Sequence, residues 1–172
     1  LQLDDQVFFL GEDIGEPAGG VFKCFKGTQT KWGERIRPTP IAEQAIIGAA
    51  TGAALVGMRP VAEIMFCDFV GVCLDQIMNH AAKQRYMSGG ATTVPMTIRT
   101  IAGGGIGGFG AQHSQSTEAT LLHYPGLKIV YPSTPTEAKG LLLSCIFDED
   151  PCIQFESMML TYATREEVPL GD

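Results

Sequence analysis

Short, uniformly apolar runs alternate with helix-like segments along the chain, and this alternation restricts the fold more than any other feature of the sequence. Five runs have the length and composition of buried strands: 7–10, 60–65, 94–100, 127–131 and 152–155. The intervening segments with helical character are 41–57, 69–87, 116–122 and 134–147. Strands that are apolar on both faces must be covered on both faces. The sequence therefore predicts an α/β fold, with a mostly parallel sheet and helices on both faces.

The length of the chain fits one domain. With 172 residues, 45% of them hydrophobic, it can bury a full core, and we expect residues 1–172 to form a single domain. The segment 11–38 is rich in glycine and charge and predicts a long loop, which in a compact domain is a candidate for function. The stretch from Thr161 onward is charged and irregular and is expected to be a linker.

The charge and the hydrophobic pattern of the chain exclude several kinds of partner and location. The net charge is -7, so nucleic acid and anionic membranes are poor partners on electrostatic grounds. No uninterrupted apolar stretch has the length of a membrane span, and the first residues do not resemble a signal peptide. We therefore expect an intracellular, cytoplasmic protein.

Four cysteines stand in apolar runs, which favours buried thiols over disulfides or a zinc site: Cys67, Cys73, Cys145 and Cys152.

The glycine-rich segment 103–108 contains the most conspicuous short motif. Gly103, Gly105 and Gly108 have the GxGxxG spacing and follow an expected strand, as in dinucleotide-binding folds. That fingerprint also needs a helix at its last glycine and an acid about 20 residues further on, and both are lacking here. A nucleotide-binding Rossmann-type module is therefore the alternative hypothesis, and a loop that presents His113 is the preferred one.

Two polar side chains are candidates for chemistry. Glu43 lies in the first turn of an Ala/Gly-rich helix for which Thr39 is the expected N-cap. A capping box would then place its acid at position 42, which is alanine, so we expect Glu43 to be buried and able to share a proton with a ligand nitrogen. Compensation of the helix dipole is the structural alternative. His113 follows an expected strand, at the edge where open α/β sheets bind ligands, although its Ser and Gln neighbours could hold it in a structural role.

Six stretches in series resemble the β subunit of the thiamine-dependent decarboxylating component of 2-oxo acid dehydrogenase complexes, of the pyruvate, branched-chain or acetoin type. They are LGEDIGEPAGGVFKCFKG, TPIAEQAIIGAATGAALVGMRPVAEIMFCDF, LDQIMNHAAKQRYMSGG, AQHSQS, PGLKIVYPSTPTEAKGLLLSCI and DEDPCIQFE. The ordered series, rather than any one motif, makes the resemblance specific. It implies a transketolase-like pyrimidine-binding domain in an enzyme that oxidatively decarboxylates a 2-oxo acid, or cleaves acetoin, and transfers the acyl group to lipoamide. A domain that has kept only the fold, without catalysis, is a further alternative.

The resemblance also implies roles for individual residues. Glu43 matches the acid that hydrogen-bonds a ring nitrogen of the thiamine diphosphate pyrimidine, and is a catalytic and cofactor-binding residue. Phe69 matches the aromatic residue that packs on this pyrimidine, and Met65 matches a neighbouring wall residue. His113 matches the catalytic histidine at the entrance for substrate and lipoyl group.

A potassium site is implied as well. Several members of this family hold potassium in the loop that here spans 144–151, mainly through backbone carbonyls. Met96, Cys145 and Asp148 are the residues that match.

The diphosphate and magnesium of such enzymes are held by a Gly-Asp-Gly motif on an α subunit, and this sequence has no such motif. The resemblance therefore implies three partners: an α subunit, a second β subunit and the lipoyl domain of the acyltransferase core. It further implies that the β subunit's C-terminal domain is absent from the chain, that the chain is inactive alone, and that a eukaryotic protein would lie in the mitochondrial matrix.

Overall fold

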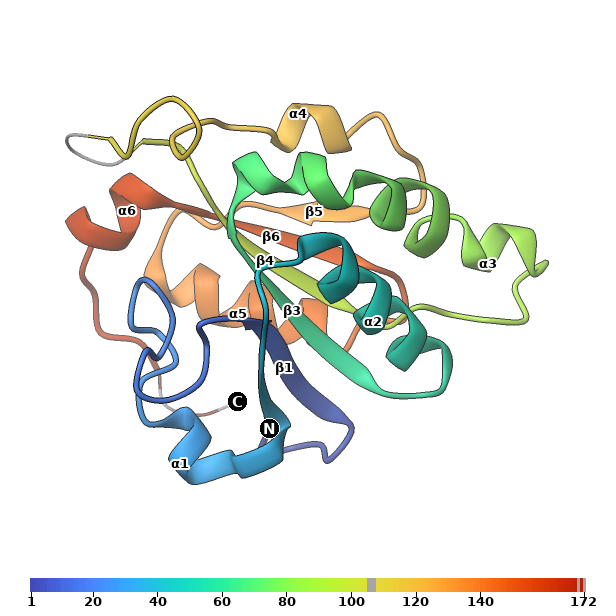
Figure 1. The fold of residues 1–172 in the computed structure, drawn as a ribbon, viewed down its shortest axis with the longest axis horizontal. Helices are drawn as coiled ribbons and strands as arrows, with labels where there is room; N and C mark the ends of the chain where they lie inside the picture. The colour runs from blue at the N-terminus through green and yellow to red at the C-terminus, as the bar shows by residue number, and fades with distance from the viewer. Residues whose placement is uncertain (105–107, 170, 172) are drawn as a thin grey trace.

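The computed structural model describes residues 1–104, 108–169 and 171. Its centre is one six-stranded sheet in the order β2-β1-β3-β4-β6-β5, in which every neighbouring pair is parallel (Figure 1). The strands are β1 (Val7–Glu12), β2 (Ile36–Thr39), β3 (Arg59–Phe66), β4 (Thr97–Ala102), β5 (Lys128–Val130) and β6 (Cys152–Ser157). The predicted α/β class and parallel sheet are confirmed, and all five expected strands are present within a few residues of their expected bounds.

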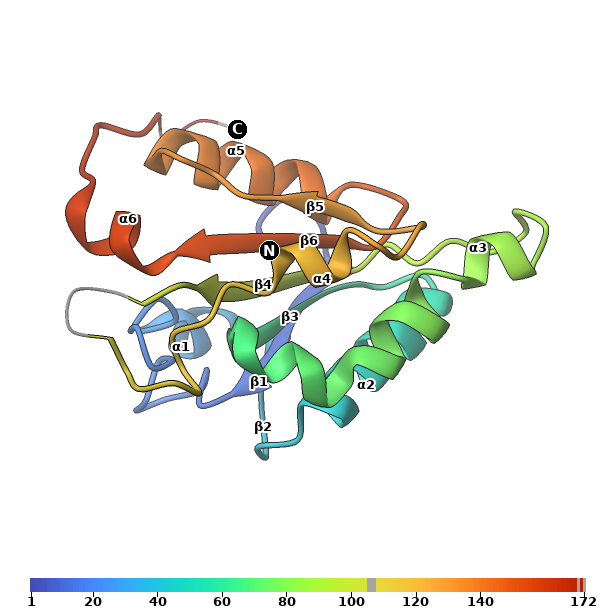
Figure 2. The ribbon, with the colours of Figure 1, turned by 90° about the horizontal axis from the view of Figure 1, so that it is seen from above.

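Helices cover both faces of the sheet. The α-helices are α1 (Thr28–Trp32), α2 (Glu43–Leu55), α3 (Gln84–Met87), α4 (Glu118–Leu121), α5 (Pro135–Ile146) and α6 (Met158–Ala163). Figure 2 shows α5 on the opposite side of the sheet from α2 and the helical segment that precedes α3. That segment is a 3-10 helix, η2 (Cys67–Cys73), followed by a π-helical turn, η3 (Gln76–Ala81). The expected single α-helix over 69–87 is thus wrong in its pitch, although the segment is helical for most of its length.

The core has a large part on the α2 side and smaller parts on the α5 side. The larger cluster joins α2, η2 and η3 to the strands, with Ile46, Ile77, Ile98 and Phe155 among its members. The strands β1 and β3 lie close together at Gly11, where an added Cβ would lie 2.8 Å from the Cβ of Glu63 in β3. The expected strand end at Gly11 is wrong, because this glycine instead lets β1 continue to Glu12 beside its neighbour.

Two further expectations about the N-terminal third are wrong. The segment 11–38 is not one long loop, because it contains α1, a 3-10 turn (Gly33–Arg35) and most of the edge strand β2. Thr39 is not the N-cap of α2, since it ends β2 and its hydroxyl donates to the carbonyl of Pro40. The helix begins later, with Ala42 as N-cap and Glu43 as its first residue. Gly57, with a φ of 92°, follows the end of this helix as expected.

The C-terminal stretch is also more ordered than expected. Residues 161–163 continue α6, and the Nζ of Lys139 in α5 donates to the carbonyl of Pro169 at 2.5 Å. The four cysteines that were expected to be buried are buried, whereas Cys24 is exposed; all five are free thiols. Among the described residues, no helix is long and apolar enough to cross a membrane.

Candidate functional site

The candidate site lies at the carboxyl edge of the sheet, where the segments after β1, β2, β3 and β4 meet. The chain runs outward from β1 to β2 and then crosses back over β1 to β3. Open α/β sheets bind ligands at such a reversal, outside the carboxyl ends of their strands. The loop that follows β4 carries His113 to the same edge.

Two carboxyl groups meet at this reversal. Glu43, the first residue of α2, is 8% exposed, and Glu12, the last residue of β1, has an Oε2 atom that is buried without a hydrogen-bond partner. Burial, and then the negative charge of Glu43, raise the pKa of Glu12. Because Ala42 has no side chain that could cap α2, the first turn of the helix offers Glu43 and free N–H groups to a ligand.

The thiol of Cys73 connects the carboxyl pair to the aromatic part of the site. Burial, and then the charge of Glu43, raise the pKa of this thiol to about 12, so it stays protonated. Its Sγ donates to the carbonyls of Val70 at 3.5 Å and Phe69 at 3.8 Å. Both hydrogen bonds lie within η2, so they tie the end of this helix to the backbone that carries Phe69.

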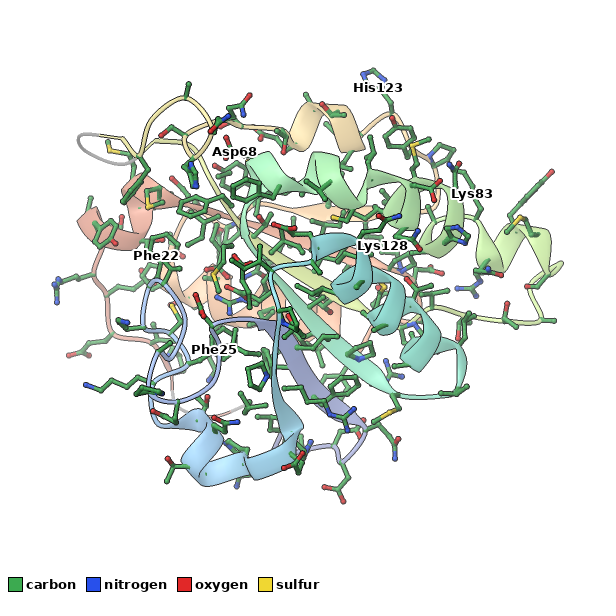
Figure 3. The ribbon with its side chains drawn as sticks, viewed as in Figure 1. Phe22, Phe25, Asp68, Lys83, His123 and Lys128 are labelled. Atoms are coloured by element: carbon green, nitrogen blue, oxygen red, sulfur yellow. The ribbon has the colours of Figure 1, made fainter. Side chains whose placement is uncertain are left out.

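An aromatic cluster surrounds His113. The ring centroid of His113 lies 5.0 Å from that of Phe66 and 5.1 Å from that of Phe69, and both contacts are edge-on. Phe22 lies in the loop between β1 and α1 (Figure 3). Its ring packs edge-on against Phe66, with the ring centroids 5.6 Å apart. Met65 is 3% exposed and belongs to the same apolar cluster as Phe66, with Phe69 packed against it. Three of the expected site residues, His113, Phe69 and Met65, are thus brought together.

Sequence reasoning missed two residues of this site. Glu12 was assigned to the long loop, and Phe66 stood unnoticed between two expected cofactor residues. A usable signal existed for Glu12, because it directly follows an apolar strand, at the edge where ligands bind. Phe66 offered none, since an aromatic residue at a strand end is usually part of a core.

The loop after β4 does not have the geometry of a dinucleotide site. Gly105 lies outside the described residues, and Gly108 is followed by further loop until α4 begins at Glu118. The binding fingerprint needs a helix that opens at its last glycine, and it belongs to the first strand–turn–helix unit of a fold. Neither condition is met, so the Rossmann-type alternative is not favoured.

The residues expected to bind potassium lie together at the opposite, amino edge of the sheet. The carbonyl of Met96 accepts from the N–H of Cys152 at 3.0 Å, and the carbonyl of Cys145 accepts from the N–H of Asp148 at 3.2 Å. Lys128 pairs with the carboxylate of Asp148 at 2.7 Å. Among the described residues, no three His, Cys, Asp or Glu side chains gather as metal ligands. Any cation here would therefore depend on carbonyl oxygens, each of which has a second lone pair.

Comparison with known proteins decides the family. The family described as "Transketolase, pyrimidine binding domain" matches residues 1–162. The chain belongs to this family. The pyrimidine-binding domain resembles solved transketolase structures in fold: a split-gene transketolase in an inactive β4 tetramer has a TM-score of 0.72 at 22% identity, covering 98% of this chain and 48% of that one. A transketolase from Pichia stipitis has a TM-score of 0.69 at 18% identity, covering 90% of this chain and 23% of that one.

Curated relatives of the pyrimidine-binding domain are more similar in sequence. The β subunit of acetoin:2,6-dichlorophenolindophenol oxidoreductase from Cupriavidus necator is 49% identical over 98% of this chain and 52% of its own length. The 2-oxoisovalerate dehydrogenase β subunit of Bacillus subtilis is 47% identical over 100% of this chain and 52% of its own. The pyruvate dehydrogenase E1 component β subunit of that organism is 45% identical over 98% and 52%. The chain spans about half the length of these relatives.

Proposed function

We propose that this chain is the pyrimidine-binding part of the β subunit of a thiamine diphosphate-dependent 2-oxo acid or acetoin dehydrogenase. The observation that carries the proposal is the buried carboxyl of Glu43 at the carboxyl edge of the sheet, in a pyrimidine-binding domain and beside Glu12. The names of the relatives support the same class of enzyme. The assembled enzyme would oxidatively decarboxylate a 2-oxo acid, or cleave acetoin, and transfer the acyl group to lipoamide.

The residues present fit the pyrimidine end of thiamine diphosphate. When bound, this cofactor supplies the nucleophilic carbon that attacks the carbonyl group of the substrate. The carboxyl of Glu43 would hydrogen-bond a ring nitrogen, and Phe69 and Met65 would supply an apolar wall for the ring. The unpartnered Oε2 of Glu12 leaves an acceptor free beside that carboxyl. A buried acid in such a place can stabilise a protonated ligand nitrogen, which an exposed acid would do only weakly.

His113 serves as the proton donor or acceptor for substrate and acyl transfer. A histidine side chain donates a proton when it is protonated and accepts one when it is neutral, so His113 has the chemistry for either role. Its edge-on contacts with Phe66 and Phe69 fix the ring plane and leave its nitrogen atoms to other partners.

Partners complete the site. We propose that an α subunit supplies the diphosphate and magnesium ligands, that a second β subunit joins the assembly, and that the lipoyl domain delivers lipoamide to His113. Ile41 and Val72, 77% and 57% exposed, border the same shallow hollow as Glu43 and support a protein partner there. A location in the cytoplasm, or in the mitochondrial matrix of a eukaryote, goes with this proposal; a 48% identical relative from Dictyostelium discoideum is named mitochondrial.

We also propose that potassium binds at the amino edge of the sheet, through the carbonyls of Met96, Cys145 and Asp148. Each of these carbonyls accepts a hydrogen bond, from Cys152, Asp148 and Arg59 respectively, and keeps a second lone pair for an ion, which supports the proposal. Because this edge lies at the other end of the strands from Glu43, the ion would stabilise the fold and take no part in the chemistry.

The proposed function is tested by reconstitution with an α subunit that carries the Gly-Asp-Gly motif. Calorimetric titration with magnesium and thiamine diphosphate should give weak binding to the chain alone and strong binding to the mixture. The mixture should then reduce a lipoyl domain in the presence of a 2-oxo acid or acetoin. Micromolar affinity for the chain alone would contradict a site shared between subunits. A mixture that binds the cofactor but transforms neither class of substrate would contradict the proposed activity.

A further inference from the structure

We infer that Asp68 is a positioning residue that holds the loop carrying His113 in place, through Gln115. The inference rests on the proposed role of His113 and extends it to a residue that does not touch the substrate. Oδ1 of Asp68 accepts two hydrogen bonds from Gln115, one from the backbone N–H at 3.3 Å and one from the side-chain Nε2 at 2.7 Å. Hydrogen bonds to a charged acceptor are roughly twice as strong as neutral ones.

The remaining polar groups of the Gln115 backbone are also engaged. Its carbonyl accepts from the N–H of Gly103 at 2.7 Å and from the Sγ of Cys67 at 3.1 Å. The hydroxyl of Thr117 donates to the carbonyl of Cys67 at 3.0 Å. Gln115, two residues after His113, is therefore held at its N–H by Asp68 and at its carbonyl by Gly103 and Cys67.

The segment 66–69 holds both the backbone of the loop and its functional ring. Its outer members, Phe66 and Phe69, contact the imidazole edge-on, and its inner members, Cys67 and Asp68, hold the backbone of Gln115. Figure 3 shows Asp68 beside the loop that follows β4. The Phe66 and Phe69 contacts restrain the imidazole ring, and the Asp68–Gln115 bonds restrain the backbone two residues after it.

These contacts indicate that Asp68 acts on the position of the loop and not directly on the substrate. Its Oδ1 is engaged by Gln115, so it orients the loop rather than exchanging protons with a ligand. Asp68→Asn keeps an acceptor oxygen and should retain most of the activity. Asp68→Ala removes both hydrogen bonds to residue 115, whereas Gln115→Ala removes the shorter, side-chain bond and keeps the one from the backbone N–H. Displacement of a catalytic group by about 1 Å can reduce the rate by roughly 100-fold, so we expect each alanine variant to lose about 10-fold to 100-fold in acyl transfer.

The experiment uses the complex reconstituted with the α subunit and the lipoyl domain. Asp68→Ala and Gln115→Ala should lower kcat and leave the affinity for thiamine diphosphate unchanged, and the double variant should lose no more activity than Asp68→Ala alone. Amide hydrogen exchange at 113–117 should speed up in both variants. Asp5→Ala, the loss of a carboxylate that is almost fully exposed at the start of the chain, is the matched control and should change nothing.

Two outcomes separate this inference from the proposed function. If His113→Ala abolishes acyl transfer while Asp68→Ala leaves both kcat and amide exchange unchanged, the inference about Asp68 is overturned and the function stands. If His113→Ala transfers acyl groups normally, the role of His113 itself is overturned. Two further results would show that Asp68 does not act through its hydrogen bonds to Gln115. One is that the losses of kcat in Asp68→Ala and Gln115→Ala add up in the double variant; the other is that Asp68→Asn is as slow as Asp68→Ala.

Discussion

Two glutamates in the first turns of the two long helices have opposite surroundings. Glu137 of α5 is exposed, and hydrogen bonds from the side chain and backbone of Ser133 lower its pKa, as expected for an acid that completes a helix N-terminus. Glu43 of α2 is buried, follows an N-cap without a side-chain acceptor, and adjoins a second carboxyl, Glu12. Glutamate in the first turn, as the first residue of α2 and the third residue of α5, thus is available to a ligand in one case and serves the fold in the other.

This contrast gives a prediction for Glu43→Gln in the reconstituted complex. Loss of one well-placed acid–base group should slow cofactor activation by roughly 10² to 10⁴ and leave the fold intact. The direct measurement is hydrogen–deuterium exchange at the thiazolium carbon of bound thiamine diphosphate. Glu137→Gln, the matched first-turn change in α5, should exchange at the normal rate. Normal exchange in Glu43→Gln would make Glu43 a structural residue.

At the scale of single elements, two threonine–proline pairs look alike in the sequence and behave differently. Thr134 is the N-cap of α5, where its Oγ1 accepts from the N–H of Glu137 at 3.2 Å and Pro135 occupies the first turn. Thr39 ends the edge strand β2 and makes no capping bond. The difference comes from pairing, because residues 36–39 align with β1 and only then does the chain turn into a helix.

We therefore expect Thr134→Ala to lower the free energy of unfolding by about 1 kcal/mol, the usual effect of losing a cap. Thr39→Ala should change it by less than about 0.5 kcal/mol, since no bond to the helix is lost. Urea unfolding of both variants at one pH provides the comparison. Equal losses would mean that Thr39 supports α2 in a way its contacts do not reveal.

The elements that sequence patterns predicted well are those defined by apolar side chains. The central strands β1, β3, β4 and β6 lie near their expected positions because burial on both faces leaves long apolar runs. The edge strand β2 was missed because Arg37 and Pro38 are exposed, and an edge strand tolerates charge and proline that a central strand would not.

Local sequence patterns could not predict the helix pitch or the close contacts between loops. The change from 3-10 to π geometry between Cys67 and Ala81 depends on packing against α2, and the side-chain period of the segment does not encode it. In the candidate site, Glu43 and His113 were proposed from their positions in the sequence, and Phe69 from the family resemblance. The Asp68–Gln115 bonds join residues 47 positions apart, and no local pattern could indicate them.

At the scale of the whole molecule, one buried ion cluster spans three neighbouring strands of the sheet. Arg99 of β4 donates to Glu63 of β3 at 3.1 Å and forms a bidentate pair with Glu156 of β6 at 3.0 Å. Two carboxyl groups share one guanidinium in the interior, so the cluster carries a net charge of -1 when both are ionised. Burial raises the pKa of Glu63 from 4.5 to about 7, although the positive charge of Arg99 offsets part of this increase.

The raised pKa of Glu63 makes the stability of the whole fold depend on pH. Between pH 4.5 and about 7 the folded chain holds a proton on Glu63 that the unfolded chain has already released. Since the folded state binds more protons in this window, the free energy of unfolding falls as pH rises through it. The full difference corresponds to roughly 3 kcal/mol. Glu137 and Glu166 act in the opposite direction: hydrogen bonds from Ser133 and Thr136 lower their pKa, so their contribution is lost as pH falls below about 4.5.

Glu63→Gln tests this account, because glutamine keeps an acceptor for Arg99 and removes the proton equilibrium. At pH 5, where Glu63 is largely protonated in the folded chain, the variant and the unaltered protein should respond to urea alike. From pH 5 to pH 8 the unaltered protein should lose up to about 3 kcal/mol more than the variant, whose profile should be flatter. Glu149→Gln, the loss of an exposed carboxylate that pairs with Arg59, should keep the original slope. Parallel profiles for Glu63→Gln and the unaltered protein would mean that Glu63 is already ionised in the fold at pH 5, and that the stability of the sheet does not depend on its protonation.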